Sequence, residues 1–392
     1  GHQLLEPDID RIAPSLEVGF KHFPAFEKAG IKQIINGPFT FAPDGNPLVG
    51  PVKGMTNYWA ACAVMAGFSQ GGGVGLSLAN WIVNGDPGLD VWAMDVSRFG
   101  DYASMQFTNA RVRENYARRF SIRYPNEELQ AARPLLTTPI YDKQKAAGAK
   151  FGAAYGLEIP LWYAPKNTSD VFSWRRSTDF DHVGAEARAV RESVGLSDIS
   201  GFAKYRVSGS GAADWLDHIL ACRLPAVGRM VLAPMLKDDG KIIGDFSLSR
   251  LDDDSFLIIG SGIAESYHMR WFLAHLPDTG DVEINSLGLD LVGLTLAGPK
   301  SRDVLQSCVS VDISHDSMRF MAIKQIDIGM IPAIVGRVSY TGDLGYEIWV
   351  APAYLNSLFD QLMTAGAAHD IRLFGSRALN VLRLEKNYGS WG

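Results

Sequence analysis

The stretch AKYRVSGSGAADWLDHILA, residues 203–221, decides the fold class. It begins as a β-strand, passes through a tight turn of the form Ser-Gly-Ser-Gly, and continues as a helix. Apolar residues recur in that helix at Trp215, Ile219 and Leu220, which is the spacing of one buried helix face. We therefore predict a strand that is joined to an amphipathic helix by a glycine-containing turn.

Two further stretches predict β-hairpins. SLSRLDDDSFLIIGS (247–261) has a strand pattern on each side of Asp252–Asp254, and IPAIVGRVSYTGDLGYEIWV (331–350) has one on each side of Thr341–Gly345. Strands that pair in hairpins belong to antiparallel sheets, whereas a parallel sheet needs a helix after each strand. The sequence therefore predicts an α+β fold rather than a series of βαβ units.

The composition is that of a soluble globular protein. Of the 392 residues, 47% are hydrophobic and 20% are charged, so the chain is long enough for two or three domains with separate cores. The formal net charge is -6 and no cluster of Lys and Arg appears. Because nucleic-acid affinity comes mainly from such clusters, we predict no nucleic-acid partner.

The cysteine and histidine patterns predict neither a metal site nor a disulfide. The three cysteines, Cys62, Cys222 and Cys308, lie far apart and lack CxxC spacing. The eight histidines include no HxH or HxxxH pair. We predict that the three thiols are free and buried.

No segment predicts a membrane span. The longest apolar run, YWAACAVMAGF (58–68), is too short to cross a bilayer. The N-terminal GHQLLEPDID has no basic region followed by an apolar stretch, so it reads as neither a signal nor a transit peptide. Together with reduced cysteines, this predicts a cytoplasmic location and no membrane partner.

The N-terminal part of the chain is rich in turn signals. A helix-like start at Ile9–Ala29 precedes a strong turn signal at Pro43–Gly45. Four glycines within Gly71–Gly75 are expected to form a loop that opens a helix at Leu76–Val83. The N-terminus of such a helix suits an anionic or carbonyl-rich cofactor, and a tight turn without a ligand is the alternative. The polar region 95–134 that follows predicts a helix and a linker.

Asp245 is the first candidate for a functional side chain. It lies in KIIGDFSLSR (241–250), which otherwise reads as a strand. Alternation along a strand predicts that Asp245 shares a face with Ile243 and Ser247, opposite Phe246. From the local pattern alone, a charge that faces solvent is the simpler interpretation.

Tyr340, Glu347 and Arg377 are further candidates. Tyr340 and Glu347 bracket the turn TGDLGY, and a six-residue connection predicts that they stand opposite each other on one side of the hairpin. A phenol beside a carboxylate suits a heteroaromatic ligand, although a cross-strand pair on a wet surface is equally consistent. Arg377 lies in FGSRALNVLRLEK (374–386), where a salt bridge on the helix surface is the default interpretation.

Four motifs taken together resemble a known family. They are, in order, TTPIYDKQKAAGAKFG (137–152), RAVRESVGLSDISGFAKYRVSGSGAADWL (188–216), LAGPKSRDVL (296–305) and SYTGDLGYEI (339–348). Their order and wording are similar to those of the folate-binding T-protein of the glycine cleavage system. The resemblance extends from about Thr137 to the end of the sequence.

The preceding segment, NGPFTFAPDGNPLVGPVKGMTNYWAACAVMAGFSQGGGVG (36–75), resembles a second group. It is similar to the C-terminal part of the FAD-dependent amine dehydrogenases of the dimethylglycine and sarcosine dehydrogenase group. In that group a flavin domain is fused to a T-protein-like domain in the same order. The resemblance implies three domains: the C-terminal part of an FAD-dependent oxidoreductase domain (1–92), a linker or middle domain (93–136), and a T-protein-like folate-binding aminomethyltransferase domain (137–392).

Two parts of the family pattern have no counterpart in the sequence. No GxGxxG follows a first strand, so the ADP-binding half of the flavin domain is missing, and RLEKNYGSWG (383–392) precedes the final β-barrel of a T-protein. We expect an α+β fold in which part of a flavoprotein amine oxidase domain and a small linker domain precede an incomplete T-protein-like domain. The chain is then either a fragment of a longer protein or one that has lost flavin chemistry.

The resemblance also implies roles for individual residues. Asp245 falls on the reactive carboxylate of the family, and Arg377 on an arginine that the family uses on the folate. The other positions expected to bind folate are Gly244, Phe246, Tyr340, Glu347, Ile348 and Trp349. The positions that match the approach to the flavin ring are Val64, Met65, Ala66, Gly67, Phe68, Ser69 and Gln70.

The implied reaction is the oxidation of an N-methyl amine to an iminium, whose carbon is captured by tetrahydrofolate. The expected small-molecule partners are thus the amine and the folate, and FAD is the expected cofactor of the complete enzyme. A folate-binding module without catalysis is the alternative from a different functional class. A stand-alone methyltransferase of the T-protein superfamily is a third interpretation, which the flavoprotein-like N-terminal segment disfavours.

Overall fold

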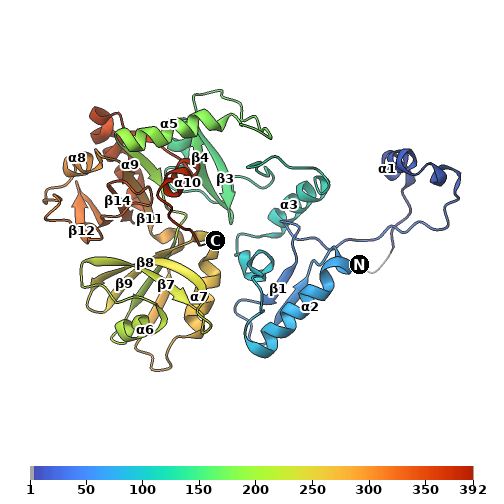
Figure 1. Cartoon of the computed structure of the whole chain (residues 1–392), viewed down its shortest axis with the longest axis horizontal. Helices are drawn as coiled ribbons and strands as arrows, with labels where there is room; N and C mark the ends of the chain where they lie inside the picture. Colours follow the sequence, from blue (N-terminus) through green and yellow to red (C-terminus); the bar gives the residue numbers. More distant parts are fainter. Residues whose placement is uncertain (1–3, 392) are drawn as a thin grey trace. The chain divides into compact units, whose positions relative to one another are not determined.

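The structure is a computed structural model that describes residues 4–391. The chain divides into two compact units, Gly1–Val96 and Ser97–Gly392. We call them the first and the second unit, and Figure 1 shows the course of the chain through each of them.

The first unit contains two longer helices and one small sheet. Its elements are α1 (Ile9–His22), the 3-10 helix η1 (Pro24–Lys28), β1 (Leu48–Pro51), β2 (Trp59–Cys62), α2 (Gly67–Asn84) and η2 (Trp92–Met94). Helix α1 starts at a capping residue, because the side chain of Asp8 accepts a hydrogen bond from the N–H of Arg11 at 3.1 Å. It ends before the predicted Ala29, because Phe23 precedes a proline and leaves the helical backbone conformation.

Helix α2 begins earlier than the sequence predicts. The four glycines within Gly71–Gly75 lie inside the helix, so the expectation that they form a loop before Leu76 was wrong. Tertiary packing overrides their low helix propensity, because Val74 and Trp81 are buried on one side of α2. Trp81 packs against β1, where a Cβ at Gly50 would lie 2.6 Å from the indole ring.

The second unit contains two large sheets and one small sheet. A five-stranded sheet has the order β10-β6-β9-β8-β7, a six-stranded sheet has the order β12-β13-β14-β11-β5-β15, and β3 pairs with β4. The strands are β3 (Ala149–Ala154), β4 (Leu157–Tyr163), β5 (Gly195–Asp198), β6 (Ala203–Ser208), β7 (Arg229–Leu236), β8 (Ile242–Asp252), β9 (Ser255–Gly260), β10 (Glu283–Ser286), β11 (Val292–Ala297), β12 (Ile323–Ile328), β13 (Ile331–Gly336), β14 (Gly345–Val350) and β15 (Arg372–Leu373).

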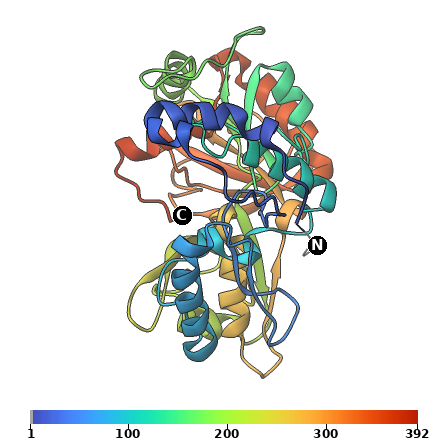
Figure 2. The same ribbon diagram turned by 90° about the vertical axis from the view of Figure 1, so that its right-hand side faces the viewer.

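Helices cover these sheets and supply their cores. The α-helices of the second unit are α3 (Met105–Ala117), α4 (Tyr141–Ala146), α5 (Asp179–Glu192), α6 (Ala212–Ile219), α7 (Glu265–Ala274), α8 (Ser301–Gln306), α9 (Pro352–Gly366) and α10 (Ser376–Glu385). One core joins the five-stranded sheet to α6 and α7, and another joins the six-stranded sheet to α8 and α9. Figures 1 and 2 show these two parts of the second unit from directions 90° apart.

A third cluster lies between the two large sheets. It joins Leu257 and Ile259 of β9 to Trp349 of β14, and each of these side chains is buried. The faces of the two sheets that do not pack on helices therefore meet along this contact. We call the region between them the inter-sheet layer.

The local predictions that rest on the strongest patterns are confirmed. Residues 203–221 form β6, a glycine turn and α6, with Trp215 and Ile219 buried. Strands β8 and β9 form the predicted hairpin, in which Asp252 pairs with Ser255. With antiparallel pairing throughout except between β15 and β5, the second unit has the α+β architecture that the sequence predicts.

The prediction of three buried thiols was wrong for two of them. Cys308 is buried, whereas Cys222 is partly buried and Cys62 is exposed. Cys62 ends β2 in a two-stranded sheet that is too small to cover both of its faces. Within residues 4–391, no helix is both long and apolar enough to cross a membrane.

Candidate functional site

A β-bulge at the start of β8 sets the direction of the Asp245 side chain. Gly244 pairs with Met235 and Ile242 pairs with Leu236, which leaves Ile243 as an extra residue. Ile243 is therefore buried in the helix-covered core together with Phe246, and the prediction that it shares a face with Asp245 was wrong. Beyond the bulge the strand alternates regularly, so Asp245 points to the opposite face, toward the inter-sheet layer.

The carboxylate of Asp245 lies at the exposed end of this face. Burial raises its pKa above the usual range for an aspartate, and backbone N–H groups of Asp245 itself and of Trp391 oppose this effect. A part of the side chain remains exposed to solvent. Asp245 can therefore exchange a proton with solvent or ligand while it is held as a stronger base than an ordinary aspartate.

The segment Tyr388–Trp391 crosses the start of β8. The indole of Trp391 stacks on Tyr267, with ring centroids 5.4 Å apart, and lies 4.6 Å from the ring of His268. Its Nε1 donates to the carbonyl of Ile242 at 3.4 Å. Trp391 therefore forms one wall beside Asp245, and local sequence patterns gave no sign of this contact.

The connection between β13 and β14 differs from the predicted hairpin turn. Glu347 pairs with Gly336 of β13 and with Thr295 of β11, so the prediction that it stands opposite Tyr340 was wrong. The ladder ends at Gly336, and residues 337–344 form a longer connection. The backbone of Arg337 turns away instead to hydrogen-bond with Met321 and Ala322.

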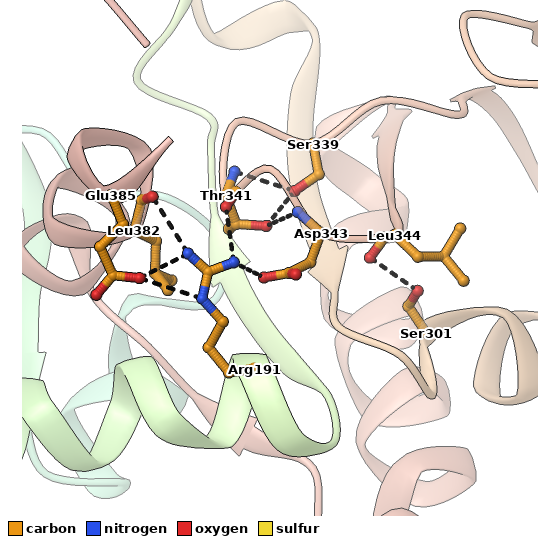
Figure 3. Close-up of polar contacts among 8 residues, drawn as sticks. All are labelled: Arg191, Ser301, Ser339, Thr341, Asp343, Leu344, Leu382 and Glu385. Carbon is orange, nitrogen blue, oxygen red and sulfur yellow. Dashed lines mark hydrogen bonds and ion pairs between the residues drawn. The ribbon is translucent and has the colours of Figure 1, made fainter. Parts of the chain in front are cut away.

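Arg191 of α5 fixes this connection, as Figure 3 shows. Its guanidinium forms an ion pair with Asp343 and donates to the Glu385 carboxylate at 3.2 and 2.7 Å. It also reaches the carbonyl of Thr341 at 3.5 Å. One arginine thus joins α5, the 337–344 connection and the end of α10.

Glu347 lies in the middle of the six-stranded sheet, on the same face of β14 as Trp349. Burial raises its pKa to about 7. Among the residues that the structure describes, none donates a hydrogen bond to this carboxylate or forms an ion pair with it. The side chain is partly buried, and an acceptor that loses water without gaining a donor is costly, so this position suits a ligand that brings N–H groups.

The two sheets bring Glu347 and the face of Asp245 into the same layer. Met230 of β7 pairs with Ser249 of β8, and its sulfur would lie 2.9 Å from a Cβ at Gly336. Gly336 in turn pairs with Glu347. Ser249, two positions along the Asp245 face from Ser247, is 1% exposed and its hydroxyl has no hydrogen-bond partner in the described chain.

Tyr340 connects this region to the end of the described chain. Its hydroxyl donates to the carbonyl of Gly389, and its ring is stacked on that of Tyr388 at 6.3 Å between centroids. The segment Tyr388–Trp391 therefore contacts Tyr340 through its first residues and Asp245 through its last. Tyr340 and Asp245 lie at the two ends of one short stretch of chain.

Three expected folate-binding residues face away from the inter-sheet layer. Phe246 and Ile348 are buried in the two helix-covered cores, on the faces opposite Asp245 and Glu347. Gly244 also faces a core, where a Cβ would lie 2.8 Å from the ring of Phe246 and 2.9 Å from Nε2 of His268. These residues shape the strands on which the site is built.

Arg377 has partners elsewhere. Its Nη1 donates to Asp179 of α5 at 2.7 Å, and its Nη2 donates to the carbonyl of Asn126 at 3.2 Å. The side chains of Arg377 and Asp179 are both 14% exposed, so this is a largely buried ion pair. The structure does not group Arg377 with Asp245 or Glu347, and it forms a salt bridge as expected by default, although the pair is largely buried between two helices rather than on the helix surface.

Comparison with known proteins identifies the family. Residues 140–392 match the GCVT N-terminal domain family, and residues 84–138 match the FAD dependent oxidoreductase central domain. The chain belongs to the GCVT N-terminal domain family. The predicted resemblance to folate-binding T-proteins and to FAD-dependent amine dehydrogenases is thereby confirmed.

Two relatives illustrate the range of this family. Dimethylglycine dehydrogenase from Mus musculus is 36% identical over 395 residues, which is 100% of this chain and 46% of that protein. The pyruvate dehydrogenase phosphatase regulatory subunit from Mus musculus is 30% identical over 402 residues, again 100% of this chain and 46% of that protein. The chain therefore spans about half the length of these relatives.

A solved structure supports the fold of the family domain. The aminomethyltransferase T of the glycine cleavage system from Bartonella henselae has a TM-score of 0.54 to this chain at 24% identity. The match covers 64% of this chain and 63% of that one. The predicted T-protein-like fold is confirmed by this likeness.

Within the GCVT N-terminal domain, sequence patterns also missed Lys204. It is 0% exposed, its Nζ donates to the carbonyl of Ser200 at 2.6 Å, and it lies 5.7 Å from the ring centroid of Trp349. Burial lowers its pKa to about 8, which the charges of Glu265 and Asp198 oppose. A lysine in a strand usually faces solvent, so the pattern gave no signal of this position.

The expected flavin segment lies in the first unit. Val64, Met65 and Ala66 connect β2 to α2, and Gly67, Phe68, Ser69 and Gln70 form the first turn of α2. Ser69 and Gln70 line a cavity of about 250 Å³ together with Val74 and Ser77. The segment thus presents the N-terminus of a long helix, whose free N–H groups fit the carbonyl-rich edge of a flavin ring.

In the described part of the chain, no group of three or more His, Cys, Asp or Glu side chains is close enough together to hold a metal ion. The charged side chains of the inter-sheet layer include the carboxylates of Asp245 and Glu347 and the ammonium group of Lys204, each on a different strand.

Proposed function

We propose that this chain is the tetrahydrofolate-binding half of an enzyme that oxidises an N-methyl amine and passes the one-carbon unit to tetrahydrofolate. The observation that carries the proposal is the partly buried carboxylate of Glu347, which faces the inter-sheet layer and has no donor among the described residues. A pterin ring carries amide and amine N–H groups on one edge, and these would satisfy such an acceptor. Membership of the GCVT N-terminal domain family supports the same ligand.

In this proposal, Asp245 is the reactive group. FAD, when bound in the complete enzyme, supplies the two-electron oxidation that turns the N-methyl amine into an iminium. A folate nitrogen then attacks the iminium carbon, and its proton passes to Asp245 as the new C–N bond forms. Asp245 returns this proton to the amine nitrogen, so that the demethylated amine leaves while the second folate nitrogen bonds to the same carbon and loses its own proton to solvent. The raised pKa of Asp245 favours this transfer, because a general base works best when its pKa approaches the working pH.

The remaining residues of the proposed site bind and orient the ligand. Glu347 accepts from the pterin, Trp349 lies beside it on the same strand face, and Tyr340 lies near the segment that reaches Asp245. Gly244, Phe246 and Ile348 support these strands from the core side. Arg377 contacts the carboxylates of the folate only if it exchanges them for Asp179.

The proposal also includes the amine and the flavin. The relative from Mus musculus is named for dimethylglycine, which is an N-methyl amine. We place the flavin ring at the segment Val64–Gln70, at the N-terminus of α2. The two relatives above are named as mitochondrial proteins, which differs from the cytoplasmic location that the sequence predicts.

Calorimetric titration of the chain with tetrahydrofolate tests the proposal. The wild-type chain should bind, and Glu347→Gln should weaken binding by at least about tenfold, because the ligand loses a charge-assisted hydrogen bond. Glu283→Gln, an exposed position on β10, is the matched control and should leave the affinity unchanged. No binding heat with the wild-type chain, or equal affinities for all three proteins, would contradict the proposal.

A second function is favoured by one specific observation. A relative that spans the same region is named a regulatory subunit rather than an enzyme. The chain would then be a folate-binding module without catalysis. Absorbance of bound flavin in the visible region, together with one-carbon transfer that depends on Asp245, distinguishes the enzyme from the module.

A further inference from the structure

A second polar cluster lies on the other face of β14. Tyr346 alternates with Glu347, so it points away from the inter-sheet layer and is 0% exposed. Its hydroxyl accepts a hydrogen bond from Nε of Arg302, on α8, at 3.1 Å. The ladder between β13 and β14 ends at Gly336 and Glu347, and the next residue, Arg337, lies close enough to Arg302 and Tyr346 for both to affect its pKa.

The donors of this cluster outnumber its acceptors. Arg337 is 9% exposed, and it donates to the carbonyl of Met318 at 2.7 Å and to Nδ1 of His315 at 3.2 Å. Its Nε and the Nη2 of Arg302 are buried and have no hydrogen-bond partner among the described residues. The hydroxyl of Tyr346 already accepts from Arg302, which leaves its own hydrogen to donate.

The cluster also carries unbalanced positive charge. Burial lowers the pKa of Arg337, and the nearby charge of Arg302 lowers it further. Asp303, which follows Arg302, pairs with Lys300, and Asp343, the acidic residue nearest in sequence to Arg337, pairs with Arg191. Asp312 accepts hydrogen bonds from Ser314 and Ser317. Two guanidinium groups held together in this way are costly unless an anion lies between them.

We propose that Arg302, Arg337 and Tyr346 form a binding site for a small inorganic anion of the halide or oxyanion type. The anion would accept from the unpaired Nη2 and Nε and from the tyrosine hydroxyl. It must be small, because these nitrogen atoms are buried. The side chain of His315 is exposed and closes the cluster on the solvent side, so it marks the entrance.

The site is separate from the proposed folate site, because adjacent residues of one strand face opposite sides of the sheet. It connects α8, the end of β13, β14 and the segment that contains His315 and Met318. An anion at this position therefore stabilises the folded second unit and takes no part in one-carbon chemistry. The two proposals can fail independently.

Thermal unfolding of the full chain in different salts tests the site. Sodium chloride and sodium phosphate are compared with sodium gluconate at equal ionic strength, because gluconate is too large to enter. An anion that binds only the folded state should raise the unfolding midpoint by about 2–4 °C near saturation. A larger rise in the midpoint with chloride assigns a halide site, and a larger rise with phosphate assigns an oxyanion site. No rise in the midpoint with either ion overturns the proposal.

Two variants separate specific binding from general screening. Arg302→Met removes a donor of the cluster and should abolish the rise in the midpoint. Arg319→Met removes a positive charge from an exposed position of the same segment and should keep the rise. An equal rise in wild-type protein and Arg302→Met would overturn the proposal.

Crystals grown in sodium bromide give a direct measurement. The anomalous scattering of bromide should produce a peak within hydrogen-bonding reach of Nη2 of Arg302 and Nε of Arg337. The proposal would be overturned by a crystal structure without an anomalous peak at this position, in which Nη2 of Arg302 and Nε of Arg337 donate hydrogen bonds to protein groups.

Discussion

The start of β8 and the middle of β14 present the same chemical group in opposite surroundings. Asp245 lies beside a bulge, contacts the backbone of Trp391 and keeps part of its side chain in solvent. Glu347 lies on a strand that is paired on both sides, and its carboxylate has no donor within residues 4–391. Asp245 is exposed, whereas Glu347 is partly buried and has no donor, so we expect Asp245 to exchange protons and Glu347 to bind a ligand that supplies hydrogen bonds.

The largest effect is expected from a substitution of Asp245. Asp245→Asn removes the base but keeps the shape, so one-carbon transfer to tetrahydrofolate should fall by about 10²–10⁴-fold. The affinity for tetrahydrofolate should change little, because in this comparison recognition belongs to Glu347. Single-turnover formation of the methylene-folate product, measured in the full-length enzyme, gives the rate, and calorimetry gives the affinity.

Asp238→Asn is the matched control for this prediction, because Asp238 is an exposed aspartate in the turn that precedes β8. It should leave both rate and affinity unchanged. A transfer rate that survives in Asp245→Asn would show that the base lies elsewhere.

The next effect concerns stability at Glu347. Its folded pKa of about 7 lies above the ordinary value of 4.5, so the folded state holds the proton more tightly than the unfolded state. Stability should therefore fall as the pH rises from about 4.5 to 7 and stay low above that range, by as much as about 3 kcal/mol. Glu347→Gln should remove this loss.

Urea unfolding at several pH values between 4.5 and 8.5 measures this effect. Burial also raises the pKa of Glu186 to about 7 and lowers that of His268 to about 4, and the contribution of His268 has the opposite sign, so the wild-type curve contains several contributions. The difference between wild type and Glu347→Gln isolates one of them. Parallel curves for the two proteins would mean that Glu347 already has a donor in the unliganded protein.

A smaller effect tests the link between the two regions. Arg191→Met removes the ion pairs with Asp343 and Glu385 and should lower the free energy of unfolding by about 1–2 kcal/mol. Hydrogen exchange of residues 339–344 should become faster, and tetrahydrofolate affinity should fall through Tyr340. Arg191→Lys should partly restore the slow hydrogen exchange and the tetrahydrofolate affinity. Unchanged hydrogen exchange in Arg191→Met would show that the 337–344 connection keeps its conformation without Arg191.

The smallest effect is expected at Ser249, in the inter-sheet layer. Ser249→Ala removes a buried hydroxyl that has no partner, so stability should stay the same or rise by up to about 1 kcal/mol. Urea unfolding at pH 7 measures the change. A clear loss of stability would mean that a bound water satisfies this hydroxyl in solution.

Local patterns predicted the parts of the fold that depend on neighbouring residues. The strand, turn and helix at 203–221 and the hairpin of β8 and β9 follow from spacing alone. The early start of α2 and the long connection before β14 do not, because Trp81 packs on β1 and the Arg337 backbone bonds to Met321 and Ala322. Such contacts join distant segments and leave no periodic signal.

The candidate site divides in the same way. The family resemblance selected Asp245 and Glu347, and the strand faces place both toward the inter-sheet layer. It did not predict that Arg377 pairs with Asp179, 198 residues earlier in the chain, or that Trp391 contacts the start of β8. The sequence patterns did not predict that Lys204 is buried, because the side chain is covered by residues of the facing sheet, such as Trp349, which are distant in the sequence.

The bulge at Ile243 has a consequence for the comparison and engineering of these chains. It is a point where one residue is added without changing the strand that follows, so length differences in the preceding turn can be absorbed there. The position of Asp245 is fixed from the other side by the unbroken pairing of residues 247–250 with β9, because a second register shift separates Arg250 from the hairpin at Asp252 and Ser255. Alignments should therefore locate this aspartate by counting backward from Arg250, and insertions before Ile243 should be tolerated where insertions between Asp245 and Arg250 are not.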